Sequence, residues 1–388
     1  MLTLSLPADN VWAFAAVWLA LATVAAFIAR RLGLAAALVE ILLGVLAGNL
    51  VGLRSTAWVD FIAGFGSIML TFLAGAEIEP AVLRRQLRPS AVIGGISFFA
   101  PFLGAMAYAY FFAHWSLDAS KIAGIAMSTT SVAVVYAVMV ESRLAGTDFG
   151  QLILAACFIT DLGTVVALGL LFANYNGWLI ALVAAIAITF VFVPKLLPPV
   201  FARTGRWISE PGMRLVFLII VILAAIATAA KSEGVLPAYF LGLACAGFLF
   251  GNPEVARRLR SMTMGFLTPF YFLKAGTLVS FTAAVAGIGA IAAFFIVKVG
   301  AKCFGVFPAA RAFQHPPKHA GYITLMMATG LTFGTISSLY GLSHHYIDGA
   351  QYTALVTVVI LTAVIPTVIA QAFFHPAEFV DPEDLGVP

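Results

Sequence analysis

The stretch from Leu152 to Phe172, LILAACFITDLGTVVALGLLF, decides the fold of this chain. As a helix it is long enough to cross the roughly 30 Å hydrocarbon core of a bilayer, and its one charged residue is Asp161. Asp161 lies about twelve residues, or about 18 Å of helix, from each end of a span expected over 149–173. A charge at that depth costs about 2.5–3.5 kcal/mol on insertion, which makes Asp161 a functional candidate. The alternative is a structural acid neutralised by hydrogen bonds or by an ion pair.

The composition of the whole chain is that of a membrane protein. Of its 388 residues, 62% are hydrophobic and 10% are charged, whereas soluble domains have about 25% charged residues. Apolar stretches recur without a polar block between them, so the sequence predicts one all-α polytopic membrane domain over 1–388. About thirteen transmembrane helices are expected, near 10–29, 34–53, 57–76, 89–113, 119–140, 149–173, 177–194, 212–230, 235–251, 262–281, 283–307, 319–342 and 350–373.

Basic residues in the connecting loops predict the orientation of these helices. One set of alternate loops holds fifteen of the 21 Lys and Arg residues and the other set holds three, while Lys274, Lys298 and Lys302 lie within spans. Because basic loops stay on the cytoplasmic side, the N-terminus is expected outside and the C-terminus inside. The basic residues are scattered rather than gathered in one patch, so no nucleic-acid partner is expected.

Two lysines of the eleventh span are further candidates. Lys298 and Lys302 are four residues apart and therefore share a helix face, and one of them can meet Asp161. Lys298 is nearer the middle of the span, whereas Lys302 is close enough to the cytoplasmic end to snorkel, and in the alternative reading both lysines only snorkel. Lys274 follows Pro269, and its ammonium can satisfy carbonyls that a proline-broken helix leaves free.

Two spans have polar centres that predict broken helices. The fifth has a hydroxyl run at 128–131, and the twelfth has a glycine and hydroxyl run at 329–335. Such centres weaken a helix, although small-residue helix packing explains either one alone. Each of these spans is the middle one of three consecutive spans, the fourth to sixth and the eleventh to thirteenth. The two triplets are seven spans apart, and an odd offset gives them opposite orientations in the membrane. The sequence thus predicts an inverted repeat whose two discontinuous helices cross at the midplane, where carbonyls and half-helix dipoles can hold a cation.

Several other polar residues have weaker signals. Glu77 and Glu79 end the third span beside a cytoplasmic loop, where Glu77 can form an acidic funnel for cations or be a solvated cap. Asp60 and the pair His344-His345 are expected to be solvated. The three cysteines lie in apolar runs without metal-ligand spacing, so they are expected to be packing residues: Cys157, Cys245 and Cys303. No cofactor is expected.

At these residues the sequence resembles the monovalent cation:proton antiporter superfamily, in its NapA-like and KefC-like branch. FLAGAEIEP is similar to the family's Phe-Leu-Ala-Gly-x-Glu stretch, and STTSVAVV is similar to its interrupted helix. Thr160-Asp161 occupies the paired position that ends in the ion-binding aspartate. Lys302-Cys-Phe-Gly305, followed by Arg311, resembles the Lys-x-x-Gly pattern of the basic partner helix. The resemblance covers nearly the whole chain.

The resemblance implies an NhaA/NapA-like antiporter fold in the cell inner (plasma) membrane and a homodimer that serves pH homeostasis. A mobile core (89–194 and 283–373) is expected to move like an elevator against a dimerisation scaffold (1–88 and 195–282). The chain departs from the pattern at Thr160, where electrogenic members have Asp and electroneutral ones Asn or Gln, so the stoichiometry stays open. Its twelfth span also lacks the Arg-Gly-Glu of many relatives, and the resemblance to KefC-type proteins does not extend to their nucleotide-binding domain. The Lys-x-x-Gly motif favours Lys302 as the partner of Asp161, whereas the position nearer the middle of the span favours Lys298.

The expected function is secondary antiport of Na⁺, or another monovalent cation, against H⁺. Asp161 is expected to bind either a proton or a desolvated Na⁺, with an oxygen shell from the broken helices and the residue preceding it. The candidate ligands are Thr160, Ser128, Thr129 and Thr130, with Gly330 and Thr332 in the second broken helix. K⁺/H⁺ antiport, sodium-coupled symport of a small organic anion and a channel are alternatives. An enzyme is not expected, because the chain has no His-Glu-x-x-His, Gly-x-Ser-x-Gly or two-carboxylate helix motif.

Overall fold

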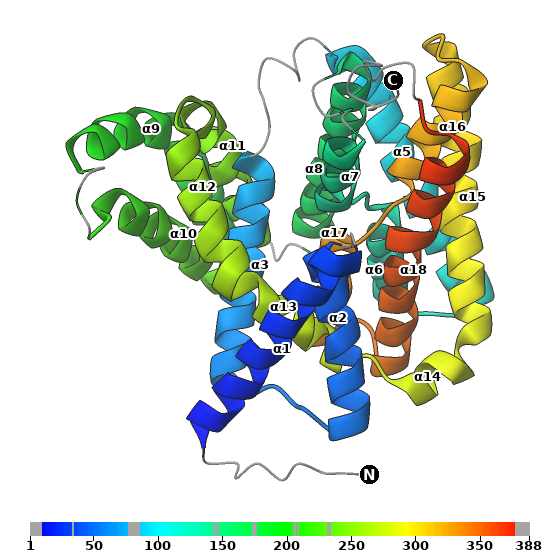
Figure 1. The fold of residues 1–388 in the computed structure, drawn as a ribbon, viewed down its shortest axis with the longest axis horizontal. Helices are drawn as coiled ribbons and strands as arrows, with labels where there is room; N and C mark the ends of the chain where they lie inside the picture. The colour runs from blue at the N-terminus through cyan, green and yellow to red at the C-terminus, as the bar shows by residue number, and fades with distance from the viewer. Residues whose placement is uncertain are drawn as a thin grey trace. The chain divides into compact units, whose positions relative to one another are not determined.

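The computed structural model describes residues 10–32, 35–76, 86–142, 144, 147–172, 177–204, 207, 209–230 and 234–376. These residues form helices and connecting loops, with no strand among them (Figure 1). In this described part, nine helical segments have the length and hydropathy to cross a bilayer, and two shorter apolar helices lie at 36–51 and 235–251. A helix satisfies its own backbone hydrogen bonds, which is what an apolar chain needs in lipid. The count of thirteen crossings and the orientation of the termini stay predictions.

The chain forms two compact units. The first consists of Met1–Ser55, Arg84–Thr164 and Phe272–Pro388, and the second of Thr56–Leu83 and Val165–Tyr271. The units group segments by proximity, and the expected division into core and scaffold segments stays a prediction.

The first unit contains most of the helices. In chain order they are α1 (Val11–Leu32), α2 (Ala36–Leu46) with the π-helical turn η1 (Ala47–Val51), α5 (Leu87–Ala107) with η2 (Tyr108–Phe112), α6 (Leu117–Ser128), α7 (Val132–Glu141), α8 (Asp148–Leu171) as far as Thr164, the end of α13 (Thr268–Thr277), α14 (Phe281–Ala286), α15 (Ile288–Ala312), α16 (Pro317–Met327), α17 (Thr332–Ser343) and α18 (Gly349–Phe373). Side chains from α5, α7, α8, α15, α16 and α18 build an apolar core in this unit.

Several helix starts in this unit have capping side chains. The Asp348 carboxylate accepts from the backbone N–H of Gln351 at 2.8 Å, and the Gln351 side chain accepts from the Asp348 N–H at 2.9 Å. This capping box begins α18 and satisfies amides that have no partner inside the helix. Ser116 caps α6 in a similar way, since its hydroxyl accepts from the N–H of Ala119.

The second unit contains α3 (Ala57–Ala76), α9 (Gly177–Thr204), α10 (Pro211–Ala229), α11 (Val235–Gly251), α12 (Pro253–Met262), η3 (Thr263–Leu267) and the start of α13. Backbones of α3 and α11 approach closely: a Cβ on Gly242 would lie 2.0 Å from the carbonyl oxygen of Phe72. Such small-residue contacts are typical of helices packed in lipid. Helix α9 continues beyond residue 194, the expected end of the seventh span, and passes Pro198 and Pro199 before it ends at Thr204. Helices in lipid tolerate such prolines when the freed backbone groups find other partners.

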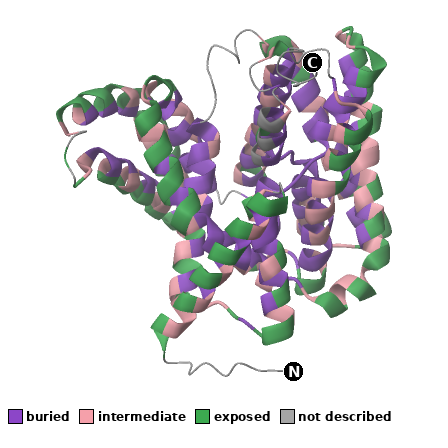
Figure 2. Cartoon of the chain, in the orientation of Figure 1, coloured by how far each residue is buried: buried purple, intermediate pink, exposed green. Residues whose placement is uncertain are grey.

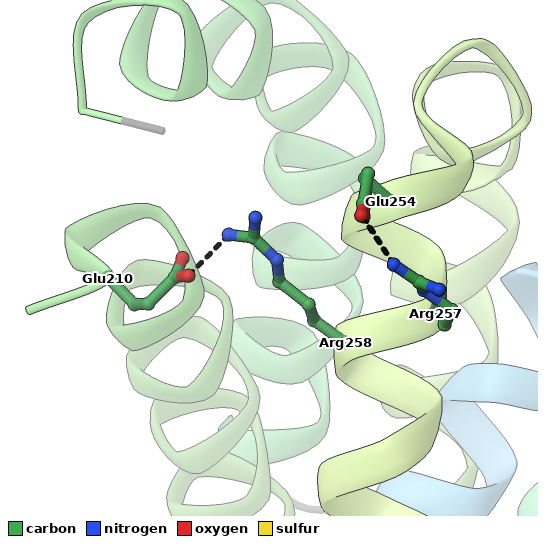
Figure 3. A network of polar contacts seen from close by, with 4 residues as sticks. All are labelled: Glu210, Glu254, Arg257 and Arg258. Atoms are coloured by element: carbon green, nitrogen blue, oxygen red, sulfur yellow. Dashed lines mark hydrogen bonds and ion pairs between the residues drawn. The ribbon is translucent and has the colours of Figure 1, made fainter. Parts of the chain in front are cut away.

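The outer surfaces are largely apolar, with α12 as an exception. Figure 2 shows exposed residues along α1 and α9, where Phe27 is 73% and Ile180 is 75% exposed. On α12, Arg257 donates to the Glu254 carboxylate at 2.9 Å, and Arg258 pairs with Glu210 (Figure 3). Exposed pairs of this kind contribute little to stability. Cys303 is also exposed on α15, so the expectation that it packs inside is wrong, whereas Cys157 and Cys245 are buried.

Candidate ion-binding site

Two broken helices meet in the first unit. Helix α6 ends at Ser128 and α7 begins at Val132, while α16 ends at Met327 and α17 begins at Thr332. The backbone at Thr129 is extended, and the N–H of Ser131 donates to the Thr329 carbonyl of the other break at 3.2 Å. Both predicted interruptions are therefore present. Thr332, expected within the second one, is the first residue of α17.

The two broken helices run in opposite directions where they pack together. A Cβ on Gly334 would lie 3.1 Å from the Thr129 hydroxyl, and a Cβ on Gly341 would lie 2.8 Å from Ile122. The chain therefore runs along α6 toward its break and along α17 away from its break, in opposite directions. Figure 1 agrees, with α6 and α17 below their breaks and α7 and α16 above them.

Asp161 lies on the unbroken helix α8 and is 2% exposed. Its neighbour Thr160 is fully buried and donates its hydroxyl hydrogen to the carbonyl of Cys157 at 2.6 Å. The Cys157 thiol, one turn before Asp161, contacts the sulfur of Met327 at 3.8 Å. Met327 is the last residue of α16, so this contact places the Asp161 turn of α8 beside the crossing.

Lys302 forms hydrogen bonds to both helix breaks. Its ammonium donates to the carbonyls of Ser128 (3.1 Å), Thr129 (3.2 Å) and Met327 (2.5 Å), and to the hydroxyl of Thr130 (3.0 Å). The three carbonyls belong to the C-terminal ends of two half-helices, where unpaired carbonyls and the negative dipole end favour a cation. The side chain is fully buried, so it does not snorkel. Its charge is near enough to Asp161 for the two to interact electrostatically.

Lys298 has a different environment, although it shares a helix face with Lys302. Its side chain is fully buried, and its ammonium has no hydrogen-bond partner among the described residues. It lies against the second break, because a Cβ on Gly330 would be 2.2 Å from Nζ. The snorkelling alternative is therefore wrong for both lysines, since the neighbouring helices enclose them.

The hydroxyls of the first break are partly used within the protein. Ser128 and Thr129 donate to carbonyls of α6, at 2.7 and 3.0 Å. Thr130 donates to the Met327 carbonyl at 2.8 Å and also accepts from Lys302. A hydroxyl that donates its hydrogen keeps lone pairs for a cation. Of the predicted ligands, Thr130 thus has a second role as a partner of the lysine.

Some predicted residues lie outside the described part of the chain. Glu77 and Glu79 are outside the described residues. Across the described residues, no three His, Cys, Asp or Glu side chains are arranged to hold a metal ion, and this includes His344 and His345.

The sequence reading missed Glu40, a carboxylate on α2 that is 5% exposed. Its signal was present, because Glu40 is the one charged residue of the expected span 34–53. Buried Ser97 on α5 and Thr362 on α18 had no such signal, since isolated hydroxyls are common in membrane helices.

Comparison with known proteins decides the family. The model of the sodium/hydrogen exchanger transmembrane region matches residues 19–375. This chain belongs to the sodium/hydrogen exchanger family. The family consists of secondary transporters rather than enzymes, so the expected family, transporter class and multi-span membrane location are confirmed.

Individual relatives of this exchanger-family chain are named as Na⁺/H⁺ antiporters. It is 24% identical over 376 residues to one from Enterococcus hirae, covering 90% of this chain and 94% of the relative. It is 26% identical over 270 residues to a putative Na⁺/H⁺ antiporter, YjbQ, of Bacillus subtilis, covering 63% of this chain and 44% of that relative. A probable Na⁺/H⁺ antiporter of Methanocaldococcus jannaschii is 25% identical over 247 residues, which are 60% of this chain and 63% of the relative.

A solved structure shares the fold. The sodium proton antiporter MjNhaP1 of Methanocaldococcus jannaschii superposes with a TM-score of 0.69 at 15% identity, covering 92% of this chain and 94% of that one. At this identity the likeness concerns the fold alone.

Proposed function

We propose that this chain exchanges Na⁺, or another monovalent cation, for H⁺ across the cytoplasmic membrane, with the cation and the proton competing for Asp161. The observation that carries the proposal is the position of Asp161: a carboxylate that is 2% exposed, on a continuous helix beside two broken ones. The relatives named as Na⁺/H⁺ antiporters support the choice of ions.

Competition follows from the cost of a buried negative charge. A carboxylate away from water is destabilised when ionised, and either a proton or a bound cation removes that cost. The two ligands neutralise the same oxygens, so binding of one requires release of the other. Exchange then has one requirement. The site must not change its exposure from one side of the membrane to the other while Asp161 is ionised and without a bound cation.

The surrounding oxygens suit a hard monovalent cation. Thr160 and Thr129 donate their hydroxyl hydrogens to helix carbonyls and so direct lone pairs elsewhere. Backbone carbonyls at a helix break supply further ligands of the same kind. Lys302 engages the carbonyls of Ser128, Thr129 and Met327, which limits how many remain for the ion.

Alternating access is proposed to occur by an elevator-type movement of the core segments (89–194 and 283–373) against the scaffold segments (1–88 and 195–282) in a homodimer. The broken helices support this, because a break at mid-depth lets one site face either side with little change in its own geometry. Glu77 is proposed to attract cations from the cytoplasm.

Exchange by Asp161→Asn in proteoliposomes tests the proposal. A pH-sensitive dye inside the vesicles reports proton movement when Na⁺, K⁺ or Li⁺ is added outside, with and without a voltage clamp by ionophore. The wild type is expected to release protons on addition of its cation, and Asp161→Asn is expected to lose this response. Asp148→Asn is the matched control, because Asp148 is exposed in the first turn of the same helix. Unchanged exchange by Asp161→Asn contradicts the proposal.

The same assay separates the alternatives. A response to K⁺ but not Na⁺ indicates K⁺/H⁺ antiport. Sodium-coupled symport of an organic anion requires that solute, so proton movement on Na⁺ addition alone argues against it. Single-channel conductance in place of saturable flux indicates a channel.

A further inference from the structure

Two parts of the first unit repeat the same element order at a nearly constant spacing. The first part is α5, α6, α7 and α8, and the second is α15, α16, α17 and α18. Each helix of the second part begins 200 or 201 residues after its counterpart in the first. The two breaks, 129–131 and 328–331, fall at equivalent places. Positions in the two parts can therefore be paired one by one.

The paired helices run in opposite directions where they touch. A Cβ on Gly104 of α5 would lie 3.3 Å from Val297 of α15, whereas a Cβ on Gly305 would lie 2.7 Å from Ile96. Later residues of α5 thus meet earlier residues of α15. This arrangement is that of an inverted repeat, in which each half supplies an equivalent set of positions around the crossing.

The pairing aligns the buried polar residues of the two halves. Asp161 lies 13 residues after the start of α8, and Thr362 lies 13 residues after the start of α18. Lys298 lies 10 residues after the start of α15, and Ser97 lies 10 residues after the start of α5. The first half therefore has a carboxylate and a short hydroxyl side chain where the second half has a hydroxyl and a long ammonium side chain.

In the second half, three polar groups converge beside Gly330. From the point where a Cβ on Gly330 would lie, Lys298 Nζ is 2.2 Å away, Thr362 Oγ1 is 3.3 Å away and Thr129 Oγ1 is 3.4 Å away. Both hydroxyls donate their hydrogens to carbonyls of their own helices, of Val359 and of Ala126. Their lone pairs are thus available to a cation, and the group that occupies this space is an ammonium.

In the first half, Ser97 lies at the level of Asp161. Helix α5 meets α8 at Gly94, where a Cβ would lie 2.7 Å from the Ala156 carbonyl, and again at Phe98, whose ring is 2.9 Å from a Cβ on Gly163. Ser97 shares this face of α5, three residues after Gly94 and one before Phe98. The section of α8 between the two contacts contains Asp161.

The Ser97 side chain is fully buried, and its hydroxyl has no hydrogen-bond partner among the described residues. A buried hydroxyl without a partner loses the hydrogen bonds that it made in water, which destabilises the folded protein. A cation beside it would recover part of that loss. Serine is also much shorter than lysine, so the volume that a lysine chain fills in the second half is not filled by this side chain in the first.

We propose that Lys298 is a tethered counterpart of the transported cation. Its ammonium fills, in the second half of the repeat, the position that the first half leaves open for a mobile monovalent cation between Ser97 and Asp161. Each half then holds one positive charge near hydroxyl groups, covalently attached in one and exchangeable in the other. The chain accordingly has one mobile cation site, and Ser97 is a ligand of that site. This inference rests on the proposed function, because the mobile ion is the one that competes with a proton at Asp161.

The first test converts the second half into an open site. Na⁺ binding to the purified full-length protein in detergent is measured by titration calorimetry at alkaline pH. The wild type is expected to bind one Na⁺ per chain, and Lys298→Ser combined with Thr362→Asp is expected to bind two. Thr362→Asp alone is the matched control and is expected to bind one, because its new carboxylate pairs with Lys298. A double variant that elutes and melts as a folded protein but still binds one Na⁺ overturns the proposal.

The second test places a tethered cation in the first half. Ser97→Lys is expected to weaken Na⁺ binding at least tenfold, whereas Ser97→Met, of similar length and without charge, is expected to weaken it less. Equal effects of the two variants overturn the proposal, since length alone would then account for them. A wild type that binds Na⁺ without exchanging it for protons contradicts the proposed function, and the number of cations bound by the variants still decides this inference.

Discussion

The ammonium of Lys302 donates a hydrogen bond to the carbonyl oxygen of Met327 at 2.5 Å. Met327 ends the half-helix α16, and the other bonds of the same ammonium go to the break that follows α6. One side chain of the continuous helix α15 therefore joins the ends of two broken helices. A carbonyl at a helix end needs a partner when it is buried, and here a lysine supplies it in place of water.

Replacing Lys302 by Met should destabilise the protein as well as impair exchange. The substitution keeps the length of the side chain but leaves buried carbonyls without a donor, at about 1–3 kcal/mol for each group left unsatisfied. A thermal-shift measurement in detergent is expected to show a Tm lower by several degrees. Lys302→Arg, which keeps the charge and the donors, should retain more of the stability. Equal melting of the Met variant and the wild type would show that the bonds to the breaks do not hold the crossing together.

Replacing Lys298 by Met should have the opposite effect on stability. The Lys298 ammonium has no hydrogen-bond partner in the described part of the chain, so its removal breaks no such bond and removes a buried charge. The Tm of Lys298→Met is expected to equal or exceed that of the wild type in the same thermal-shift assay. Lys302→Met is the control, because it is the same substitution made one helix turn away. A larger loss in Lys298→Met than in Lys302→Met contradicts the different environments of the two lysines.

Alanine at Gly330 should disturb Lys298 rather than the fold. The new Cβ would lie 2.2 Å from Nζ, which is the free end of a flexible chain and can move. We expect Gly330→Ala to lower exchange about tenfold, equivalent to about 1.4 kcal/mol, within the usual range for added volume in a packed interior. The same substitution made together with Lys298→Ser should cost little more than Lys298→Ser alone. Fully additive losses in this double-mutant cycle would mean that Gly330 acts through another contact.

Acid should destabilise the turn between α15 and α16 through His315. Burial, together with the nearby His319, lowers the pKa of His315 below its ordinary value, so folding favours its neutral form. The resulting stability is present above the ordinary histidine pKa of about 6.5 and is lost as the pH falls through the lower folded value. His315→Gln is therefore expected to show a smaller loss of Tm between pH 7.5 and 5.5 than the wild type. A loss of Tm in His315→Gln as large as that of the wild type would contradict this role of His315.

Much of the fold could be predicted from the sequence, because it depends on which segments are apolar enough to lie in lipid. Long apolar stretches become helices in lipid since no other partner exists for their backbone groups, and hydroxyl and glycine runs weaken those helices where they occur. The interruptions at 128–131 and 329–335 were therefore visible in the sequence. Asp161 was visible for the same reason, as a charge whose cost in lipid demands a role.

The roles of the two lysines were decided only by the tertiary structure. Lys298 and Lys302 share one face of α15, so helical periodicity treats them alike, and the motif and depth arguments favoured different residues. Their environments come from segments far along the chain: Lys302 meets the carbonyl of Ser128, 174 residues away, and Lys298 meets Gly330. Ser97 and Thr362 became candidates in the same way, once packing had brought the two halves together. The sequence by itself determined which groups lie in the membrane, because that depends on local composition; which group meets which depends on how the helices pack, and no local pattern contains that information.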